Sequence, residues 1–225
     1  MIRKFKTNKE LTKYISGKNI TLLSNVTEGT CYLGEDNKVY KIIGLDSIVD
    51  VSYNIDDIIT EDDIKLKSFA FPQELFVVDN KLAGYSSEYI PDNKLKSTDY
   101  SIKTVATMDF NKFSRAYKTM KKDVIKLSSK NILINDLCSN IVYDGKRLVG
   151  IDTCGYKKVD YNPTKNNIDS YDYAIECIFR FCYNKMFTPK LKFNGSDIDS
   201  YLKNVEDELP DRAKLYREKI IKKRK

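Results

Sequence analysis

The pattern of apolar residues changes near Pro91, and this change limits the folds that the 225-residue chain can adopt. Before Pro91, short apolar runs bounded by turn residues predict several strands and little helix. After it, apolar residues recur mostly at the three- to four-residue spacing of helices, with one hairpin among them. We therefore predict an α+β fold in two parts, residues 1–90 and residues 91–225.

In the first part, the predicted strands end at recognisable turns. They cover residues 19–26, 30–34 and 38–43, and a hairpin covers residues 73–90. Asp79-Asn80 forms the tip of that hairpin. A short helix is predicted over residues 9–16, with Thr7 or Asn8 as its cap, and a less regular one over residues 54–67. Residues 90–98 break the pattern and predict a linker.

In the second part, helices predominate. They are predicted over residues 109–128, 169–183 and 197–206, the last capped by Ser196, with a further helix beginning near Pro210. A hairpin over residues 140–152 interrupts them. Its tip carries Asp144-Gly145, the residue pair that a type I′ turn needs.

Composition narrows the possible chemistry. The five cysteines are odd in number and form no C-x-x-C pair, which indicates reduced thiols rather than a disulfide framework or a zinc knuckle. There is no histidine, which excludes Ser-His-Asp and Cys-His schemes and most zinc catalysis. No apolar run approaches the roughly 18 residues of a membrane span, and the N-terminus lacks the apolar core of a secretion signal. A cytoplasmic protein is expected.

The net charge of +7 is concentrated at the C-terminus. Residues 211–225 carry eight basic and two acidic side chains, so they contribute +6. One interpretation is a solvated terminal helix, and the other is a contact with a phosphate-rich partner. Tyr216 is the only aromatic residue in this segment, and base stacking needs several, so the sequence argues against nucleic acid as a partner.

Two positions suggest a charged site inside the fold. Lys41 lies in the middle of a predicted strand between Tyr40 and Ile42, and a lysine in a buried strand needs an anion. On an edge strand the same lysine would instead point into water. Asp152 directly follows the apolar run of residues 148–151, where a carboxylate is costly without a cation.

A second group of polar residues precedes Asp152 in the stretch from Ile134 to Tyr156. Asp136 and Asn140 lie four residues apart, just before the predicted hairpin. Carboxylate and amide oxygens are hard ligands that suit a bound hard cation. The alternative interpretation is a loop rich in Asp and Asn around an ordinary hairpin.

From about Asn25 to Cys182, the order of elements and the polar residues at their junctions resemble the protein-kinase-like superfamily. The similarity is greater to its small bacterial and aminoglycoside-phosphotransferase-like branches than to eukaryotic kinases. The resemblance implies a two-lobed fold, with a small antiparallel-sheet N-lobe over 1–90 that binds nucleotide and a helical C-lobe over 91–225. It also implies an ATP- and Mg²⁺-dependent transfer of the γ-phosphate to a hydroxyl of a protein or a small molecule.

The resemblance assigns a role to each candidate residue. Asp136 would orient and deprotonate the attacking hydroxyl, and Asn140 and Asp152 would hold Mg²⁺. Lys41 would contact the phosphates and pair with an acid of the following helix, for which Glu61 is the choice among four. The remaining contacts to nucleotide would come from the backbone of Gly29, Glu88 and Ile90.

Several departures from the family pattern leave other functions open. Asp136 and Asn140 are one residue closer than in the family, and Ile134 and Asn135 replace its usual His and Arg. The glycine-rich loop keeps only Gly29 and Gly34. The family aspartate that pins the catalytic loop would be Asp169 or Asp172. A pseudokinase that binds nucleotide without catalysis is therefore the alternative, and a nucleic-acid-binding protein led by the basic tail is a third.

Overall fold

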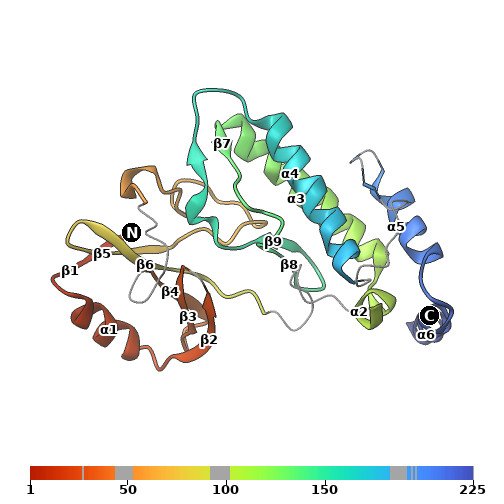
Figure 1. Cartoon of the computed structure of the whole chain (residues 1–225), viewed down its shortest axis with the longest axis horizontal. Coiled ribbons are helices and arrows are strands. Elements are labelled where there is room, and N and C mark those ends of the chain that lie inside the picture. The colour runs from red at the N-terminus through yellow and green to blue at the C-terminus, as the bar shows by residue number, and fades with distance from the viewer. Residues whose placement is uncertain are drawn as a thin grey trace. The chain divides into compact units, whose positions relative to one another are not determined.

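The computed structural model describes residues 1–26, 28–43, 53–91, 102–182, 192–193, 195 and 197–224. Across these ranges the chain forms ten strands and six α-helices (Figure 1), which confirms the predicted α+β class. The chain divides into two units: Met1–Ile90 with Asp152–Lys157, and Pro91–Ile151 with Lys158–Lys225. No helix in the described ranges is both apolar and long enough to cross a membrane.

The first unit is built on a six-stranded sheet. Its strands are β1 (Ile2–Phe5), β2 (Thr21–Val26), β3 (Gly29–Leu33), β4 (Lys38–Ile43), β5 (Glu74–Val78) and β6 (Lys81–Glu88). Their order is β1-β5-β6-β4-β3-β2, and only the β1–β5 pair is parallel. The predicted strands and the Asp79-Asn80 tip are confirmed. The sequence analysis missed β1, which is short and half exposed.

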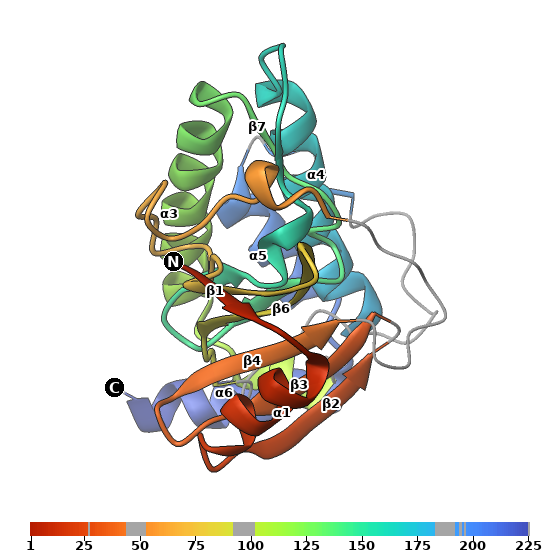
Figure 2. The same cartoon turned by 90° about the vertical axis from the view of Figure 1, so that its left-hand side faces the viewer.

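One face of this sheet is covered by α1 (Asn8–Ser16; Figure 2). The helix begins where predicted, because the Thr7 hydroxyl accepts a hydrogen bond from the Glu10 backbone N–H. It buries Leu11 and Ile15 in a cluster with Tyr40 and Phe76. The rings of Tyr40 and Phe76 stack with centroids 6.1 Å apart. This cluster fixes the middle of β4, the strand that carries Lys41.

On the opposite face, a row of side chains runs across the sheet. Leu75 of β5 pairs with Tyr85 of β6, Tyr85 with Lys41 of β4, and Lys41 with Cys31 of β3. Residues paired in register share a face, so Lys41 and Tyr85 project together. Gly84 permits the close approach of β6 to β4, because a Cβ at Gly84 would lie 2.4 Å from the Lys41 carbonyl oxygen.

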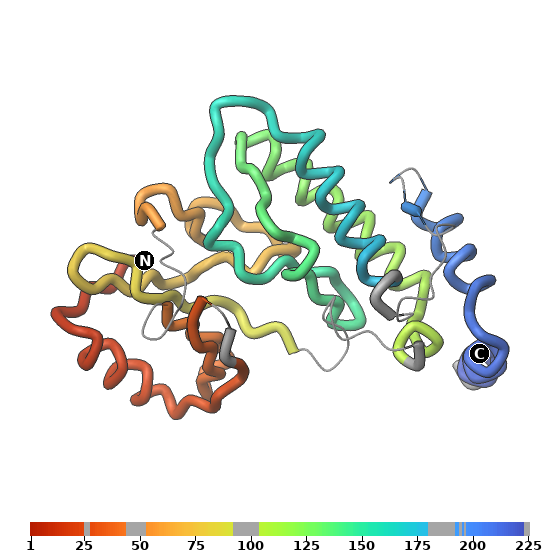
Figure 3. The backbone as a smooth tube through the Cα atoms, in the orientation of Figure 1, coloured from red at the N-terminus to blue at the C-terminus, as the bar shows by residue number. Residues whose placement is uncertain are grey.

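The second unit is mainly helical. Its helices are α2 (Ile102–Thr107), α3 (Phe110–Ser129), α4 (Thr164–Cys182), α5 (Ile198–Asp207) and α6 (Asp211–Arg224). The long helices α3 and α4 lie side by side (Figure 3), joined by Phe113 against Phe179 at 5.2 Å and by stacked Tyr117 and Tyr171 at 5.2 Å. These helices were predicted, although α4 begins five residues earlier than expected. The sequence analysis missed α2.

Short strands accompany the helices. They are β7 (Ile132–Leu133), the hairpin β8 (Ile141–Tyr143) with β9 (Leu148–Gly150), and β10 (Lys157–Lys158). The tip of the hairpin differs from the prediction. Tyr143 pairs with Leu148, so the loop has four residues, and only Gly145 of Asp144-Gly145 has a positive φ. The Asp144 carboxylate instead caps the backbone N–H groups of Lys146 and Arg147.

The predicted helix over residues 54–67 is wrong. The segment contains the 3₁₀ turn η1 (Ile55–Asp57) and a turn at 61–63. Side chains here bond the local backbone, as when the Asp63 carboxylate accepts from the Thr60 N–H at 2.8 Å, and such bonds compete with a helix. The predicted linker beyond Pro91 and the Ser196 cap lie outside the described residues. Asp197 caps α5.

Candidate functional site

The first unit contains a buried lysine held by two carboxylates. Lys41 is 4% exposed. Its Nζ lies 2.7 Å from both Asp152 oxygens and 3.1 Å from Glu28 Oε2. The lysine therefore faces the interior of the first unit rather than water. An ammonium group so buried requires paired negative charge, which these two carboxylates supply.

The charge state of Lys41 follows from the same contacts. Burial alone would lower the pKa of its ammonium group, but Asp152 and Glu28 outweigh that effect and raise the pKa above its usual value. Lys41 is therefore a fixed positive charge at neutral pH.

Tyr85 completes the cluster from the neighbouring strand. Its hydroxyl donates a 2.5 Å hydrogen bond to Asp152 Oδ1, and Lys41 Nζ lies 5.9 Å from the centre of its ring. Burial is the main cause that raises the pKa of the Tyr85 phenol well above its usual value. The phenol therefore stays protonated and acts as a donor to the carboxylate.

Asp152 has an unusual backbone conformation. Its φ and ψ of 55° and 47° lie in the left-handed region, which costs a non-glycine residue about 1–3 kcal/mol. The following 3₁₀ turn, η2 (Thr153–Gly155), fixes this conformation within the first unit, because the buried Thr153 hydroxyl donates to the Ala70 carbonyl. Tyr156 then packs edge-on against Phe69 and Phe71. These contacts therefore hold the Asp152 backbone in a left-handed conformation that a non-glycine residue does not prefer.

The two carboxylates of this cluster are hard oxygen donors. Glu28 and Asp152 already converge on one positive charge, the Lys41 ammonium. Two carboxylates with phosphate and water oxygens are a typical Mg²⁺ environment. Within the described residues no group of three or more Cys, Asp or Glu side chains could hold a metal.

The second unit contains the Asp136–Asn140 loop. Asp136 is exposed and has a φ of 46°, again in the left-handed region. Asn140 Nδ2 donates to the Asp136 carbonyl oxygen at 3.0 Å and to its Oδ2 at 3.3 Å. The fully buried Leu137 anchors the turn between them. The short spacing therefore forms a compact turn in which Asn140 Oδ1, the atom a cation would bind, makes no hydrogen bond among the described residues.

Asn167 holds the chain just before this loop. Its Oδ1 accepts from the Ile134 N–H at 2.8 Å, while its Nδ2 donates to the Ile132 carbonyl at 2.8 Å and to Ser128 Oγ at 2.9 Å. Asp169 and Asp172 were the candidates for this role. Asp169 is exposed, and Asp172 instead accepts from Tyr117 and Lys121. The sequence analysis missed Asn167 because the predicted helix began after it.

The remaining predicted residues take varied positions. Glu61 is exposed in a turn, and the carboxylates that contact Lys41 are Glu28 and Asp152, so the pairing differs from the prediction. Gly29 opens β3, where a Cβ would lie 2.0 Å from the Ile42 carbonyl oxygen. Glu88 ends β6 and is exposed, whereas Ile90 is buried. The sequence analysis missed Glu28, which lies in the turn before β3, and Tyr85, which only strand register places beside Lys41.

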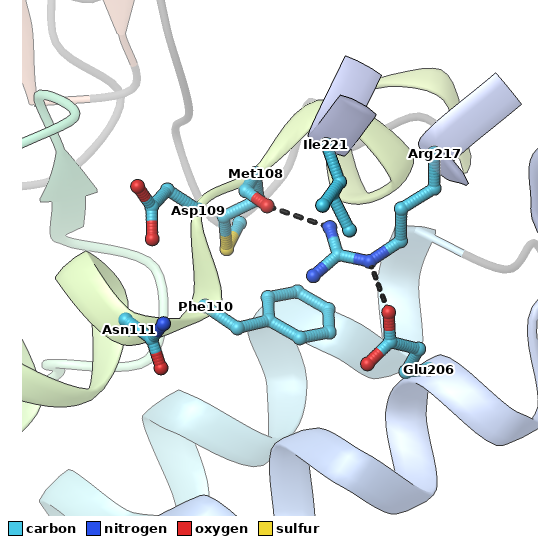
Figure 4. Close-up of a pocket in the computed structure, with 7 residues that line it drawn as sticks. All are labelled: Met108, Asp109, Phe110, Asn111, Glu206, Arg217 and Ile221. Atoms are coloured by element: carbon cyan, nitrogen blue, oxygen red, sulfur yellow. Dashed lines mark hydrogen bonds and ion pairs between the residues drawn. The ribbon is translucent and has the colours of Figure 1, made fainter. Parts of the chain in front are cut away.

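A cavity of about 300 Å³ in the second unit involves none of the predicted residues (Figure 4). Arg217 of α6 reaches into it and is 6% exposed. Its Nε donates to Glu206 at 2.6 Å, its Nη1 donates to the Met108 carbonyl at 2.6 Å, and its guanidinium lies 3.9 Å above the Phe110 ring. These contacts attach the basic terminal helix to α5 and to the start of α3.

Neither the protein-family models nor the curated proteins searched contain a match to this chain. The assignment of a function therefore rests on the residues and contacts described above.

Proposed function

We propose that the protein is an ATP- and Mg²⁺-dependent phosphotransferase with a protein-kinase-like, two-lobed fold. It would transfer the γ-phosphate to a hydroxyl group of a protein or a small molecule. The observation that supports this most is the buried Lys41 ammonium between Asp152 and Glu28. A purely structural sheet does not require a buried lysine paired with an aspartate 111 residues away, because an apolar residue at that position would be more stable.

The nucleotide would be bound by groups on one face of the sheet. Lys41 would donate to phosphate oxygens. Val39 lies two residues before Lys41 and Ser87 two residues after Tyr85. They pair in register, so they share the face of Lys41 and Tyr85. A flat base would lie against this face of the sheet, beside the small side chain of Ser87. The backbone of Glu88 and Ile90 would then bond the edge of the base.

Mg²⁺, when bound, would neutralise charge that develops on the phosphates during transfer. By the resemblance, the residues that would hold it are Asp152 and Asn140. The residues of the chain would do the remaining work by position. Asp136 would orient the acceptor hydroxyl and accept its proton, a role typically worth about 10²–10⁴-fold in rate.

Binding without catalysis is the second candidate function. One observation favours it: Asn140 Nδ2 donates to both the carbonyl oxygen and Oδ2 of Asp136, so the carboxylate is engaged within its own loop. A pseudokinase would keep Lys41, Asp152 and nucleotide affinity while lacking phosphoryl transfer. Both functions therefore predict nucleotide binding through Lys41 and Asp152. Only the first predicts that Asp136 takes part in phosphoryl transfer.

Both functions predict that the protein binds ATP, and this prediction can be tested directly. ATP with MgCl₂ should raise the melting temperature of the protein, since a ligand of the native state stabilises it by mass action. Lys41→Met should abolish most of this shift. Lys38→Met is the matched control, because Lys38 lies on the same strand without contacting Asp152, and it should retain the shift. An unchanged melting temperature at millimolar ATP would exclude both functions. Transfer of label from γ-labelled ATP to proteins and small alcohols would then separate them.

A further inference from the structure

The terminal helix α6 has one side attached to the second unit and another side that is exposed. Ala213 and Arg217 are buried, and Arg217 bonds Glu206 and the Met108 carbonyl. Leu215, by contrast, is 59% exposed. It lies two residues from each of the buried positions, and two residues are roughly half a turn of an α-helix. Leu215 therefore points away from the unit to which α6 is attached.

Three cations share the exposed side of α6 with Leu215. Arg212, Lys219 and Lys222 are all exposed. Along the helix these four residues follow one another at spacings of three or four, so their side chains form one continuous row, here called the outer stripe. Tyr216, which is 43% exposed, borders the stripe. The stripe thus places an apolar side chain among positive charges.

The cations of the outer stripe lack a counter-charge within the part of the chain that the structure describes, where none of them forms an ion pair. On α3 the situation differs, since Lys118 lies 2.6 Å from the Asp199 carboxylate. The acids of α6, Asp211 and Glu218, are exposed beside the stripe and balance only part of its charge. Residues 211–225 keep a net charge of +6, which favours a partner with negative charge.

We propose that the outer stripe of α6 docks on the surface of a lipid bilayer that contains anionic lipids. The cations would lie among the headgroups, and Leu215 would enter the bilayer just below them. This inference does not depend on the proposed phosphotransferase function.

The exposed leucine favours a bilayer over other polyanions. A bilayer buries an apolar side chain below its headgroups, while lysine and arginine extend their stems and keep their charges among the headgroups. The ring and hydroxyl of Tyr216 suit the same boundary between apolar and wet regions. The phosphate backbone of a nucleic acid gains nothing from a leucine, and binding of bases needs more aromatic side chains than the single tyrosine of this segment.

The test measures sedimentation of the full-length protein with vesicles at low salt. One set of vesicles contains phosphatidylcholine alone, and the other contains phosphatidylcholine mixed with phosphatidylserine. Wild type is compared with Leu215→Ser and with the double variant Lys219→Gln, Lys222→Gln. Each protein is also titrated with a single-stranded RNA. Melting curves check that each variant is folded.

The long helix α3 of the same unit provides matched controls. Arg115 and Lys122 are exposed there, so Arg115→Gln with Lys122→Gln removes the same amount of charge. Ile125 of α3 is 44% exposed, so Ile125→Ser removes a comparable apolar side chain. These variants separate the outer stripe from the general charge and apolar surface of the protein.

Wild type is expected to bind the anionic vesicles and not the neutral ones. The double lysine variant should bind about 30-fold more weakly, because each lysine near an anionic bilayer contributes about a factor of five. Leu215→Ser should weaken binding about tenfold through the lost apolar burial. Both α3 controls should bind as wild type does.

Three results would overturn the inference. The first is a wild type that does not bind the anionic vesicles, or α3 controls that weaken binding as much as the α6 variants. The second is a Leu215→Ser variant that binds as well as wild type, which would leave only a general attraction between charges. The third is tighter binding of wild type to the RNA than to the anionic vesicles.

Discussion

Asn167 accepts a hydrogen bond from the backbone N–H of Ile134 at 2.8 Å, and so connects the first turn of α4 to the chain two residues before Asp136. Because Asn167 is fully buried and also bonds the Ile132 carbonyl, its removal leaves two backbone groups without partners. Asn167→Ala should lower the free energy of unfolding by about 2–3 kcal/mol. Asn166→Ala, an exposed change one residue earlier, should leave it nearly unchanged in urea unfolding. Equal stabilities would contradict this account of the loop.

Asp136→Asn separates catalysis from binding. The substitution keeps the size of the side chain and removes the charge that would take the proton. Phosphoryl transfer should fall by about 10²–10⁴-fold while ATP binding is retained. Asp152→Asn should weaken Mg²⁺-dependent binding as well. The exposed Asp160→Asn serves as a control in the same unit. A wild type and an Asp136→Asn variant with the same transfer rate would show that Asp136 has no role as base.

Asp144 predicts a pH dependence of stability. Burial raises the pKa of its carboxyl, but the N–H groups of Arg147 and Lys146 and the Arg147 guanidinium outweigh burial and lower the pKa below its usual value. A group with a lowered pKa in the folded state stabilises the protein above its unfolded pKa and loses that contribution as the pH falls. Asp144→Asn should therefore be less stable than wild type at neutral pH, and the difference should shrink below about pH 4. A difference that is constant from pH 7 to pH 3 would contradict this.

Arg217 should matter more for stability than its place in a basic tail implies. Arg217→Ala would leave the Met108 carbonyl and Glu206 without their donor and expose the Phe110 ring. We expect a loss of about 2–3 kcal/mol in chemical unfolding. Arg212→Ala, an exposed change on the same helix, should cost little. If the two variants are equally stable, α6 is not anchored by this contact.

The exposed lysines of α6 test whether the tail binds a polyanion. The double variant Lys219→Gln with Lys222→Gln lowers the exposed charge of α6, and Lys9→Gln with Lys13→Gln does the same on α1. If α6 is only a solvated helix, both variants should elute from heparin at the same salt concentration. Earlier elution of the α6 variant alone would identify a polyanion-binding surface there.

Local signals in the sequence predicted the elements that depend on nearby residues. The helix α1 and the β5–β6 hairpin were predicted because caps and turn residues act within a few positions. The predicted helix over residues 54–67 is wrong because acidic side chains there bond the local backbone, which the spacing of apolar residues does not reveal. Lys41 and Asp152 were chosen from the sequence. Their partners Glu28 and Tyr85 were not, because a turn brings Glu28 to Lys41 and strand register brings Tyr85 to it, and no short motif records either.

The return of residues 152–157 to the first unit has a consequence for synthesis on the ribosome. Lys41 leaves the exit tunnel 111 residues before Asp152, so the first ninety residues emerge with an ammonium group that still lacks its main counter-charge. Those residues cannot reach their final packing until the hairpin of β8 and β9 has been translated. A nascent chain stalled at Ile90 should therefore be sensitive to protease, and one stalled well beyond Lys157 should be protected.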